Sequence, residues 1–242
     1  MATTHLYQRD SYLREVDAVV RSVEGNRVLL DQTIIHPTSG GVAHDTGVMR
    51  AGGVEYRIVD AIYDKANDDV VHVLDREPAL KPGDSVRIIL DWERRYRLMR
   101  LHTASHIMAG IAYSKYGALV TGGDIQPDYG KDDYNIQLGG DELRKAFNEI
   151  VAEANEVVKR GIEVKVYWLP RSEALKIPGI VKLAGREPPP SETWRIVEIP
   201  GVDIQADGGP HVANTREVGE IVLQKIENRG RNRKRIYFTV KP

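Results

Sequence analysis

An α+β fold is predicted for this chain of 242 residues, with a small β-barrel domain followed by a larger domain of mixed helices and strands. Three observations carry the prediction. Short β-branched segments separated by glycine turns fill residues 1 to about 90, which is typical of a small barrel. The spacing of apolar residues becomes helical near residue 91. Helices and strands then share the rest of the chain, so we expect two domains, residues 1–90 and 91–242.

The strands expected in the first domain are bounded by turn residues. A glycine follows Glu24, glycine pairs follow Ser39 and Ala51, and the stretch 81–84 carries Pro and Gly. Between these turns the chain is rich in Val, Ile and Leu. The expected strands are residues 17–23, 26–31, 54–59, 70–74 and 85–90.

A long helix is expected to open the second domain, at residues 92–116, because apolar side chains recur there at helical spacing. A second helix is expected over residues 143–159 and should end at Gly161. Three consecutive prolines at 188–190 indicate a loop. The expected strands of this domain are residues 164–169, 194–199, 220–226 and 235–240.

The composition limits the kinds of function that are possible. Hydrophobic residues make up 41% of the chain, no apolar run is long enough to span a membrane, and no signal peptide is recognised, so we expect a cytoplasmic protein. Cysteine is absent, which excludes disulfide partners and thiolate nucleophiles and leaves His, Asp and Glu as metal ligands. The net charge is −1, but the segments 94–100 and 229–235 are basic. These segments are either solvated faces or contacts for phosphates.

Two pairs of potential metal ligands stand out, each with members four residues apart. His102 and His106 share one face of the expected first helix, and Asp207 and His211 flank a Gly-Gly-Pro loop. Three histidines and one aspartate suit Zn²⁺ better than Ca²⁺ or Mg²⁺. The alternative is that the first pair is structural, that Asp207 opens a turn and that His211 is incidental.

The remaining histidines give weaker signals. His36 and His44 flank the glycine loop at 37–41 and are a second, poorer candidate for a metal site. We expect His5, His44 and His72 to lie at the surface.

Several segments resemble the editing domain of alanyl-tRNA synthetase and its free-standing AlaX relatives. The two pairs of potential metal ligands lie in segments that carry the resemblance, residues 101–106 and 203–219. The glycine-rich stretch 30–47 matches the motif of the family's amino-terminal barrel. Further similarity lies in residues 6–15, in 121–128, which matches a loop after the metal helix, and in the basic stretch 225–236. The length is that of the medium-length AlaX type. The resemblance therefore implies a β-barrel followed by an editing domain of the threonyl/alanyl-tRNA synthetase type, acting in trans.

The sequence departs from the family pattern at four places. Asp207 stands where the family has a cysteine ligand, and Pro210 stands where it has threonine before the last histidine. The family's three-glycine run begins here with Ser39, and its following glutamine is Val42. These departures bear on fine specificity more than on the fold.

The resemblance implies a hydrolase that deacylates mischarged tRNA(Ala), chiefly seryl-tRNA(Ala) and also glycyl-tRNA(Ala), with one Zn²⁺ per chain. Thr33 maps onto the family's threonine that recognises the serine hydroxyl; the alternative is that it caps a turn. Asp207 is expected either as a fourth ligand or as the base that holds the attacking water. The catalytic candidates are thus Thr33 and Asp207. The substrate-binding candidates are Thr33, Gly40, Gly41, Arg100, Arg233 and Arg235.

Three alternatives remain open from the sequence. Within the family, zinc could anchor the amino group of the substrate while ribose hydroxyls and backbone orient the water. Outside it, the chain could be a zinc-containing tRNA-binding module with no or reduced activity, or a zinc hydrolase acting on a small ester or amide. No membrane partner is expected, and no oligomeric state is predicted.

Overall fold

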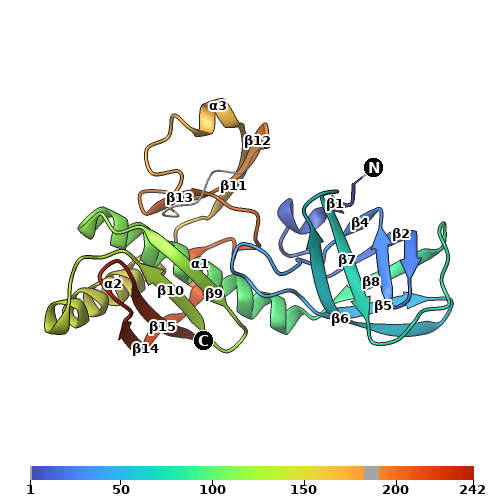
Figure 1. Ribbon diagram of the computed structural model, residues 1–242, viewed down its shortest axis with the longest axis horizontal. Helices are drawn as coiled ribbons and strands as arrows, with labels where there is room; N and C mark the ends of the chain where they lie inside the picture. Colours follow the sequence, from blue (N-terminus) through green and yellow to red (C-terminus); the bar gives the residue numbers. More distant parts are fainter. Residues whose placement is uncertain (1, 183–190) are drawn as a thin grey trace. The chain divides into compact units, whose positions relative to one another are not determined.

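The protein is described by a computed structural model that covers residues 2–182 and 191–242 (Figure 1). The chain divides into two compact units, Met1–Leu98 and Met99–Pro242. Sheets and a few helices form both units, so the predicted α+β class is confirmed. The domain limits expected at residues 90 and 91 stay a prediction. No helix in the described part of the chain has the length and apolar character needed to cross a membrane.

The first unit is built around a closed six-stranded barrel, as the glycine-punctuated strands predicted. Inward-facing Val, Leu and Ile side chains alternate with outward polar ones along each strand, and they form one buried core. Around the barrel the strands follow the order β2 (Glu15–Glu24), β3 (Arg27–Leu30), β7 (Asp69–Leu74), β6 (Val54–Asp64), β5 (Gly47–Ala51) and β8 (Ser85–Leu90). Two short strands, β1 (Thr4–His5) and β4 (Gln32–Thr33), pair in parallel, and the helical turn η1 (Leu6–Gln8) directly follows β1.

A buried ion pair fixes the glycine-rich segment of this unit. The guanidinium of Arg95 contacts the carboxylate of Asp45, and both side chains are fully buried. Arg95 also donates to the carbonyls of Ser11 and Ile34, while Asp45 accepts the backbone N–H of His36. A buried ion pair with further hydrogen bonds to the backbone is costly to break from one side. Arg95 is therefore structural, and this part of the basic segment 94–100 is not available to phosphates.

The second unit contains the long helix α1 (Trp92–Tyr116) from Met99 onward, and its predicted limits are confirmed. The second helix, α2 (Gly140–Arg160), begins three residues earlier than predicted and ends as expected at Gly161, whose φ of 65° is left-handed. A four-stranded sheet has the order β14 (Glu220–Asn228), β15 (Lys234–Lys241), β10 (Gly130–Tyr134) and β9 (Val120–Ile125).

A smaller sheet in this unit has the order β11 (Lys165–Pro170), β12 (Thr193–Ile199) and β13 (Asp203–Ala206) (Figure 1). The short helix α3 (Arg171–Ala174) covers one face around the buried ring of Trp194, and η2 (Thr215–Val218) leads into β14. β11 lies at one edge of this sheet, and β13 leads directly into the Asp207 loop.

The loop expected at residues 121–128 was wrong for residues 121–125, because residues 120–125 pair as strand β9 with β10. Strands β1, β4, β5, β10 and β13 were also missed. Their sequences are polar or glycine-containing, and the pairing with neighbouring strands, rather than local propensity, makes them strands. The proline run at 188–190 lies outside the described residues.

Candidate metal centre

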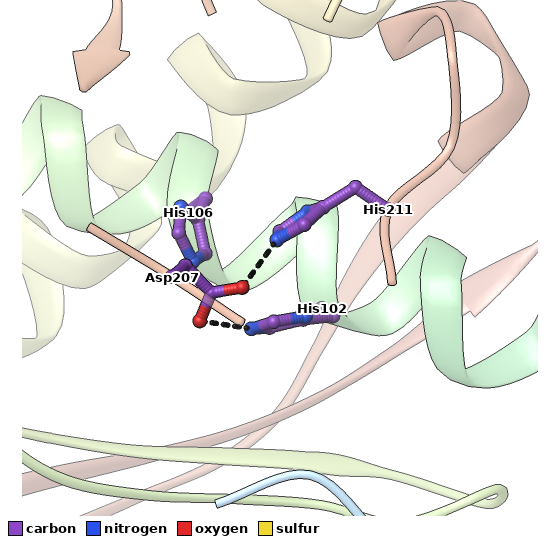
Figure 2. Close-up of side chains that lie close together, drawn as sticks. All are labelled: His102, His106, Asp207 and His211. Atoms are coloured by element: carbon purple, nitrogen blue, oxygen red, sulfur yellow. Dashed lines mark hydrogen bonds and ion pairs between the residues drawn. The ribbon is translucent and has the colours of Figure 1, made fainter. Parts of the chain in front are cut away.

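Three imidazoles and one carboxylate converge in the second unit (Figure 2). Helix α1 presents His102 and His106 from successive turns, and their ring centroids are 4.9 Å apart. His211 lies 4.1 Å from His102 and 4.5 Å from His106 between ring centroids. Asp207 completes the group, and the four ligand atoms lie within 4.8 Å of one another. The two predicted ligand pairs therefore meet at one point.

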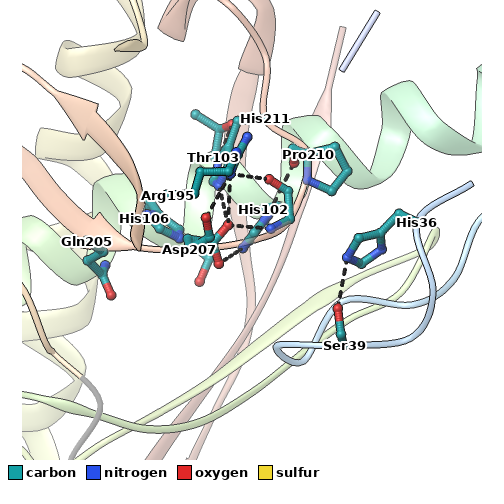
Figure 3. A network of polar contacts seen from close by, with 12 residues as sticks. His36, Ser39, His102, Thr103, His106, Arg195, Gln205, Asp207, Pro210 and His211 are labelled. Carbon is teal, nitrogen blue, oxygen red and sulfur yellow. Dashed lines mark hydrogen bonds and ion pairs between the residues drawn. The ribbon is translucent and has the colours of Figure 1, made fainter. Parts of the chain in front are cut away.

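The loop that carries Asp207 and His211 is held by its own backbone and by one arginine (Figure 3). Arg195 of β12 donates to the carbonyls of Asp207 at 2.8 Å and Gly209 at 3.0 Å. Gly209 donates its N–H to Oδ2 of Asp207 at 2.7 Å, which leaves Oδ1 of that carboxylate facing Nε2 of His102 at 3.7 Å. A Cβ at Gly209 would lie 2.8 Å from the His102 ring, so only glycine fits there.

Each imidazole is oriented by a hydrogen bond at Nδ1. Nδ1 of His106 contacts Asp203 Oδ2 at 3.0 Å, and that of His102 contacts the Pro210 carbonyl at 3.3 Å. Nδ1 of His211 contacts the Thr103 hydroxyl at 3.0 Å. Since a neutral ring with a protonated Nδ1 carries its lone pair on Nε2, these contacts leave the Nε2 lone pairs as the ligands.

The electrostatics favour metal-ready protonation states at His102, His211 and Asp207, whereas at His106 the hydrogen bond and charge of Asp203 outweigh burial and raise the pKa. Burial lowers the pKa of His102 to about 4 and that of His211 well below its usual value. Burial alone would raise the pKa of Asp207, but the neighbouring His102 and His211 outweigh it and place that pKa well below the usual range. Neutral imidazoles and an ionised carboxylate are the forms that bind a metal.

The residues fit a divalent metal ion. Donors 2.0–2.2 Å from a tetrahedral Zn²⁺ lie about 3.4 Å from one another. The contact of Asp207 with Nε2 of His211 is 3.3 Å and that with Nε2 of His102 is 3.7 Å. Nitrogen and oxygen donors without a thiolate suit Zn²⁺ and also other first-row divalent ions. Among the described residues, no other group of three or more such side chains gathers in this way.

Two family models match the chain. One, described as "Threonyl and Alanyl tRNA synthetase second additional domain", matches residues 194–237, and the other, described as "tRNA synthetases class II (A)", matches residues 4–94. The chain is 52% identical over 240 residues to an alanyl-tRNA editing protein AlaX-M of Saccharolobus solfataricus, covering 99% of this chain and 100% of that protein. The chain belongs to the AlaX-M family of alanyl-tRNA editing proteins.

Other relatives agree with this membership. An AlaX-M protein of Methanosarcina mazei is 37% identical over 247 residues, covering 98% of this chain and 96% of that protein. The alanine–tRNA ligase of Hyperthermus butylicus is 39% identical over 229 residues, which cover 93% of this chain but only 24% of the ligase. The predicted family and the predicted AlaX-M type are thus confirmed.

The predicted serine-recognising residue of this AlaX-M protein is fully buried in the first unit. The hydroxyl of Thr33 lies 2.8 Å from Nε2 of His72 and accepts the N–H of Ile35 at 3.0 Å. Nδ1 of His72 faces the Val28 carbonyl at 3.2 Å, and a carbonyl only accepts, so Nδ1 carries the proton. Burial lowers the pKa of His72 to about 4, so the ring is neutral at pH 7 and Nε2 accepts a hydrogen bond from the Thr33 hydroxyl. Toward a further partner, the hydroxyl oxygen of Thr33 can therefore only accept a hydrogen bond.

The predicted substrate arginines are engaged within the second unit. Arg100 is buried and donates to the carbonyls of Val218 and Lys241, which gives it a structural role. Arg233 and Arg235 both contact the carboxylate of Asp133. The side chain of Arg235 is 11% exposed, whereas that of Arg233 is 55% exposed. Of the three, only Arg233 presents a largely accessible guanidinium.

The predicted glycines Gly40 and Gly41 lie exposed in the first unit, both with positive φ. Two of the three surface predictions for histidines were wrong. His72 is fully buried, and the side chain of His5 is only 9% exposed against the ring of Tyr7. His44 is 24% exposed. His36 is buried and contacts the hydroxyl of Ser39 at 3.1 Å, so its role here is within the glycine-rich loop.

The residues that sequence reasoning missed are those that support the ligands. Asp203 pairs with Lys182 at 2.8 Å as well as with His106, and both side chains of the pair are at most 5% exposed. Thr103 and Arg195 orient His211 and the ligand loop. Asp203 precedes Asp207 by four residues, the same spacing as the ligand pairs, but its partner lies 97 residues away in sequence. No local signal reveals that contact.

Proposed function

We propose that this protein is a trans-acting aminoacyl-tRNA deacylase that hydrolyses the ester of mischarged tRNA(Ala), chiefly seryl-tRNA(Ala) and also glycyl-tRNA(Ala). The observation that carries the proposal is the convergence of three oriented Nε2 atoms with the Asp207 carboxylate. The names of the AlaX-M relatives support the tRNA substrate.

We assign one Zn²⁺ per chain to His102, His106 and His211, with Asp207 as the adjacent carboxylate. Bound there, zinc supplies Lewis-acid chemistry, polarising the ester carbonyl and activating water. The chain provides the rest. The Nδ1 contacts hold the rings in one orientation, and the N–H of Gly209 holds Oδ2 of Asp207. Oδ1 of Asp207 would then act in one of two ways: as a fourth ligand of the metal, or as the base that accepts a proton from the attacking water.

Discrimination against correct alanyl-tRNA requires recognition of one hydroxyl. An apolar synthetase pocket rejects an analogue with an added hydroxyl only about 100-fold, so a second site must recognise the hydroxyl itself. We assign this recognition to Thr33. The hydroxyl of Thr33 donates its hydrogen bond to Nε2 of His72. Its oxygen would therefore accept a hydrogen bond from the serine hydroxyl. Gly40, Gly41 and the accessible Arg233 stay candidates for substrate contacts.

The test is a deacylation assay on seryl-, glycyl- and alanyl-tRNA(Ala), run with zinc-loaded protein and after treatment with a chelator. We expect rapid release of serine, slower release of glycine, retention of alanine, and loss of activity with the chelator that zinc restores. Undiminished activity after complete metal removal would contradict the metal assignment. Tight tRNA binding without release of any amino acid would instead support a binding module.

A further inference from the structure

One tryptophan lies exposed on the same sheet face as the metal loop. Trp168 of β11 pairs with Arg195 of β12, and the N–H of Asp207 bonds to the carbonyl of Arg195 at 3.1 Å, so the three residues form one row across the strands. Residues directly opposite in antiparallel strands share a face. At the usual strand spacing, the Cα atoms of Trp168 and Asp207 are about 10 Å apart.

The environment of Trp168 differs from that of the other two tryptophans. Trp92 stacks on Tyr96 with ring centroids 5.3 Å apart and has the Arg14 guanidinium above it, and Trp194 is 98% buried. The side chain of Trp168 is 44% exposed, and among the described residues no ring or cation is recorded against it. An indole ring is seldom left accessible beside a polar site without a partner for its face.

The other exposed aromatic ring in the described chain is already in use. Tyr113 is 39% exposed, but the ammonium of Lys182 lies 5.5 Å from its ring centroid and the backbone of Gly179 packs against its edge. Of the two exposed aromatic rings in the described part of the second unit, Trp168 is therefore the one whose face is free for a planar ligand.

We propose that Trp168 stacks on the nucleobase of the terminal nucleotide whose ribose carries the ester. This inference rests on the proposed deacylase function. The ester must reach the cluster at Asp207, and one ribose separates the ester from its base. The base therefore has to rest close to the cluster but beside it, which is where the row Trp168–Arg195–Asp207 places the indole. Base–aromatic stacking contributes strongly to binding and does not require hydrogen bonds to the edges of the base.

The exposed cations at the ends of β11 do not lie beside Trp168. Lys165 begins the strand three residues before Trp168, so the two side chains alternate to opposite faces. Arg171 directly follows the strand, and its guanidinium lies 5.9 Å from the ring centroid of Trp194, whose side chain is on the face opposite Trp168. Stacking of the base, rather than neighbouring cations, would therefore hold the nucleotide. Arg195, one step closer to the metal, is occupied with the loop carbonyls and is not needed for binding.

The first experiment measures steady-state deacylation of seryl-tRNA(Ala) by Trp168→Phe, Trp168→Leu and the control Leu175→Ala, which alters an equally exposed apolar side chain outside the row. Loss of one stacked base should raise KM about 5- to 100-fold in Trp168→Leu with kcat nearly unchanged. Trp168→Phe keeps a π-face and should retain most of the affinity. Equal KM values for the Leu and Phe variants would overturn the proposal, because apolar bulk rather than stacking would then be what matters.

The second experiment needs no hydrolysis. The trinucleotide CCA, which has the sequence of the tRNA end, is titrated while tryptophan fluorescence is recorded. We expect quenching in the wild type that is lost in Trp168→Phe although CCA still binds by calorimetry. CCA binding with identical quenching in both proteins, or no binding to either, overturns the stacking proposal. Quenching in a protein that releases no amino acid from any tRNA supports stacking and refutes the deacylase instead.

Discussion

Two of the buried histidine sites of this protein, the metal centre and His72, use the same side chain in different ways. In the second unit, Nδ1 of each metal-site histidine contacts a protein oxygen and Nε2 faces a shared centre (Figure 2). In the first unit, Nδ1 of His72 also contacts a carbonyl, but Nε2 is occupied by the hydroxyl of Thr33. The group that Nε2 faces therefore decides whether the histidine serves as a metal ligand or supports a neighbouring hydroxyl.

The partners of these sites explain the difference further. At the metal centre, carboxylates lie on both sides: Asp203 behind His106, and Asp207 in front of His102 and His211. The charge of Asp203 is compensated by Lys182, while Asp207 is 16% exposed at its side chain. Among the described residues no carboxylate contacts His72, and the hydrogen bond to the Val28 carbonyl offsets its desolvation only in part, so the ring stays neutral.

The largest effect is expected from Asp207→Ala. Removing the carboxylate that faces the histidine ligands should lower kcat for seryl-tRNA(Ala) by at least about 100-fold, in the range seen when a general base is removed. Zinc content by atomic absorption then separates the two roles. Lost zinc identifies a ligand, and retained zinc with lost activity identifies the water-holding base. Asp207→Cys is the matched variant, since a thiolate binds zinc but is a poor base. Full activity of Asp207→Ala would exclude both roles.

Asp203→Asn should weaken zinc binding about 10- to 100-fold, because it removes the charge that orients Nδ1 of His106. The measurement is competition with a chromophoric chelator. Ser105→Ala is the control: Ser105 lies on the same helix beside His106 but donates to Asp132, not to a ligand partner. If both variants bind zinc like the wild type, Asp203 does not position the ligand.

The sequence predicted much of the metal centre because its information is local. Helical spacing placed His102 and His106 on one face, and a Gly-Gly-Pro loop placed Asp207 beside His211. The supporting shell was not predictable, since the partner of His106 is Asp203 and such contacts depend on tertiary packing.

The same limit applies to the fold. Alternating apolar residues predicted five barrel strands, but β9 and β10 are polar strands formed by their pairing with each other and with β15. His72 lies in a strand, where successive side chains point to opposite faces, so the sequence did not show whether it points into the barrel or outward. The register of β7 with β3 and β6 turns it inward.

Replacement of His72 tests the first-unit site through pH. The pKa of His72 is lowered by burial to about 4, against about 6.5 in an unfolded chain, so between these values the unfolded state binds more protons. Stability contributed by the neutral ring is therefore present above pH 6.5 and is lost as pH falls towards 4. From pH 7 to pH 5 this amounts to about 2 kcal/mol.

His72→Gln keeps an acceptor and a donor but does not titrate. Urea unfolding with a chelator present should show that the wild type loses about 2 kcal/mol more than this variant between pH 7 and pH 5. Equal losses in the two proteins would mean that His72 is not neutral in the folded state.

The smallest effect concerns specificity and comes from Thr33→Val. One hydrogen bond contributes about 0.5–1.5 kcal/mol net, so the ratio of seryl- to alanyl-tRNA(Ala) cleavage should fall about 2- to 10-fold. The variant also leaves Nε2 of His72 and the N–H of Ile35 without their partner, so some stability is lost as well. Thr33→Ser retains the hydroxyl and should keep the wild-type ratio. Because the cleavage ratio compares two substrates on the same protein, a general loss of folded enzyme cancels. A ratio unchanged in Thr33→Val would remove Thr33 from serine recognition and leave the Thr33–His72 pair as a structural element of the barrel.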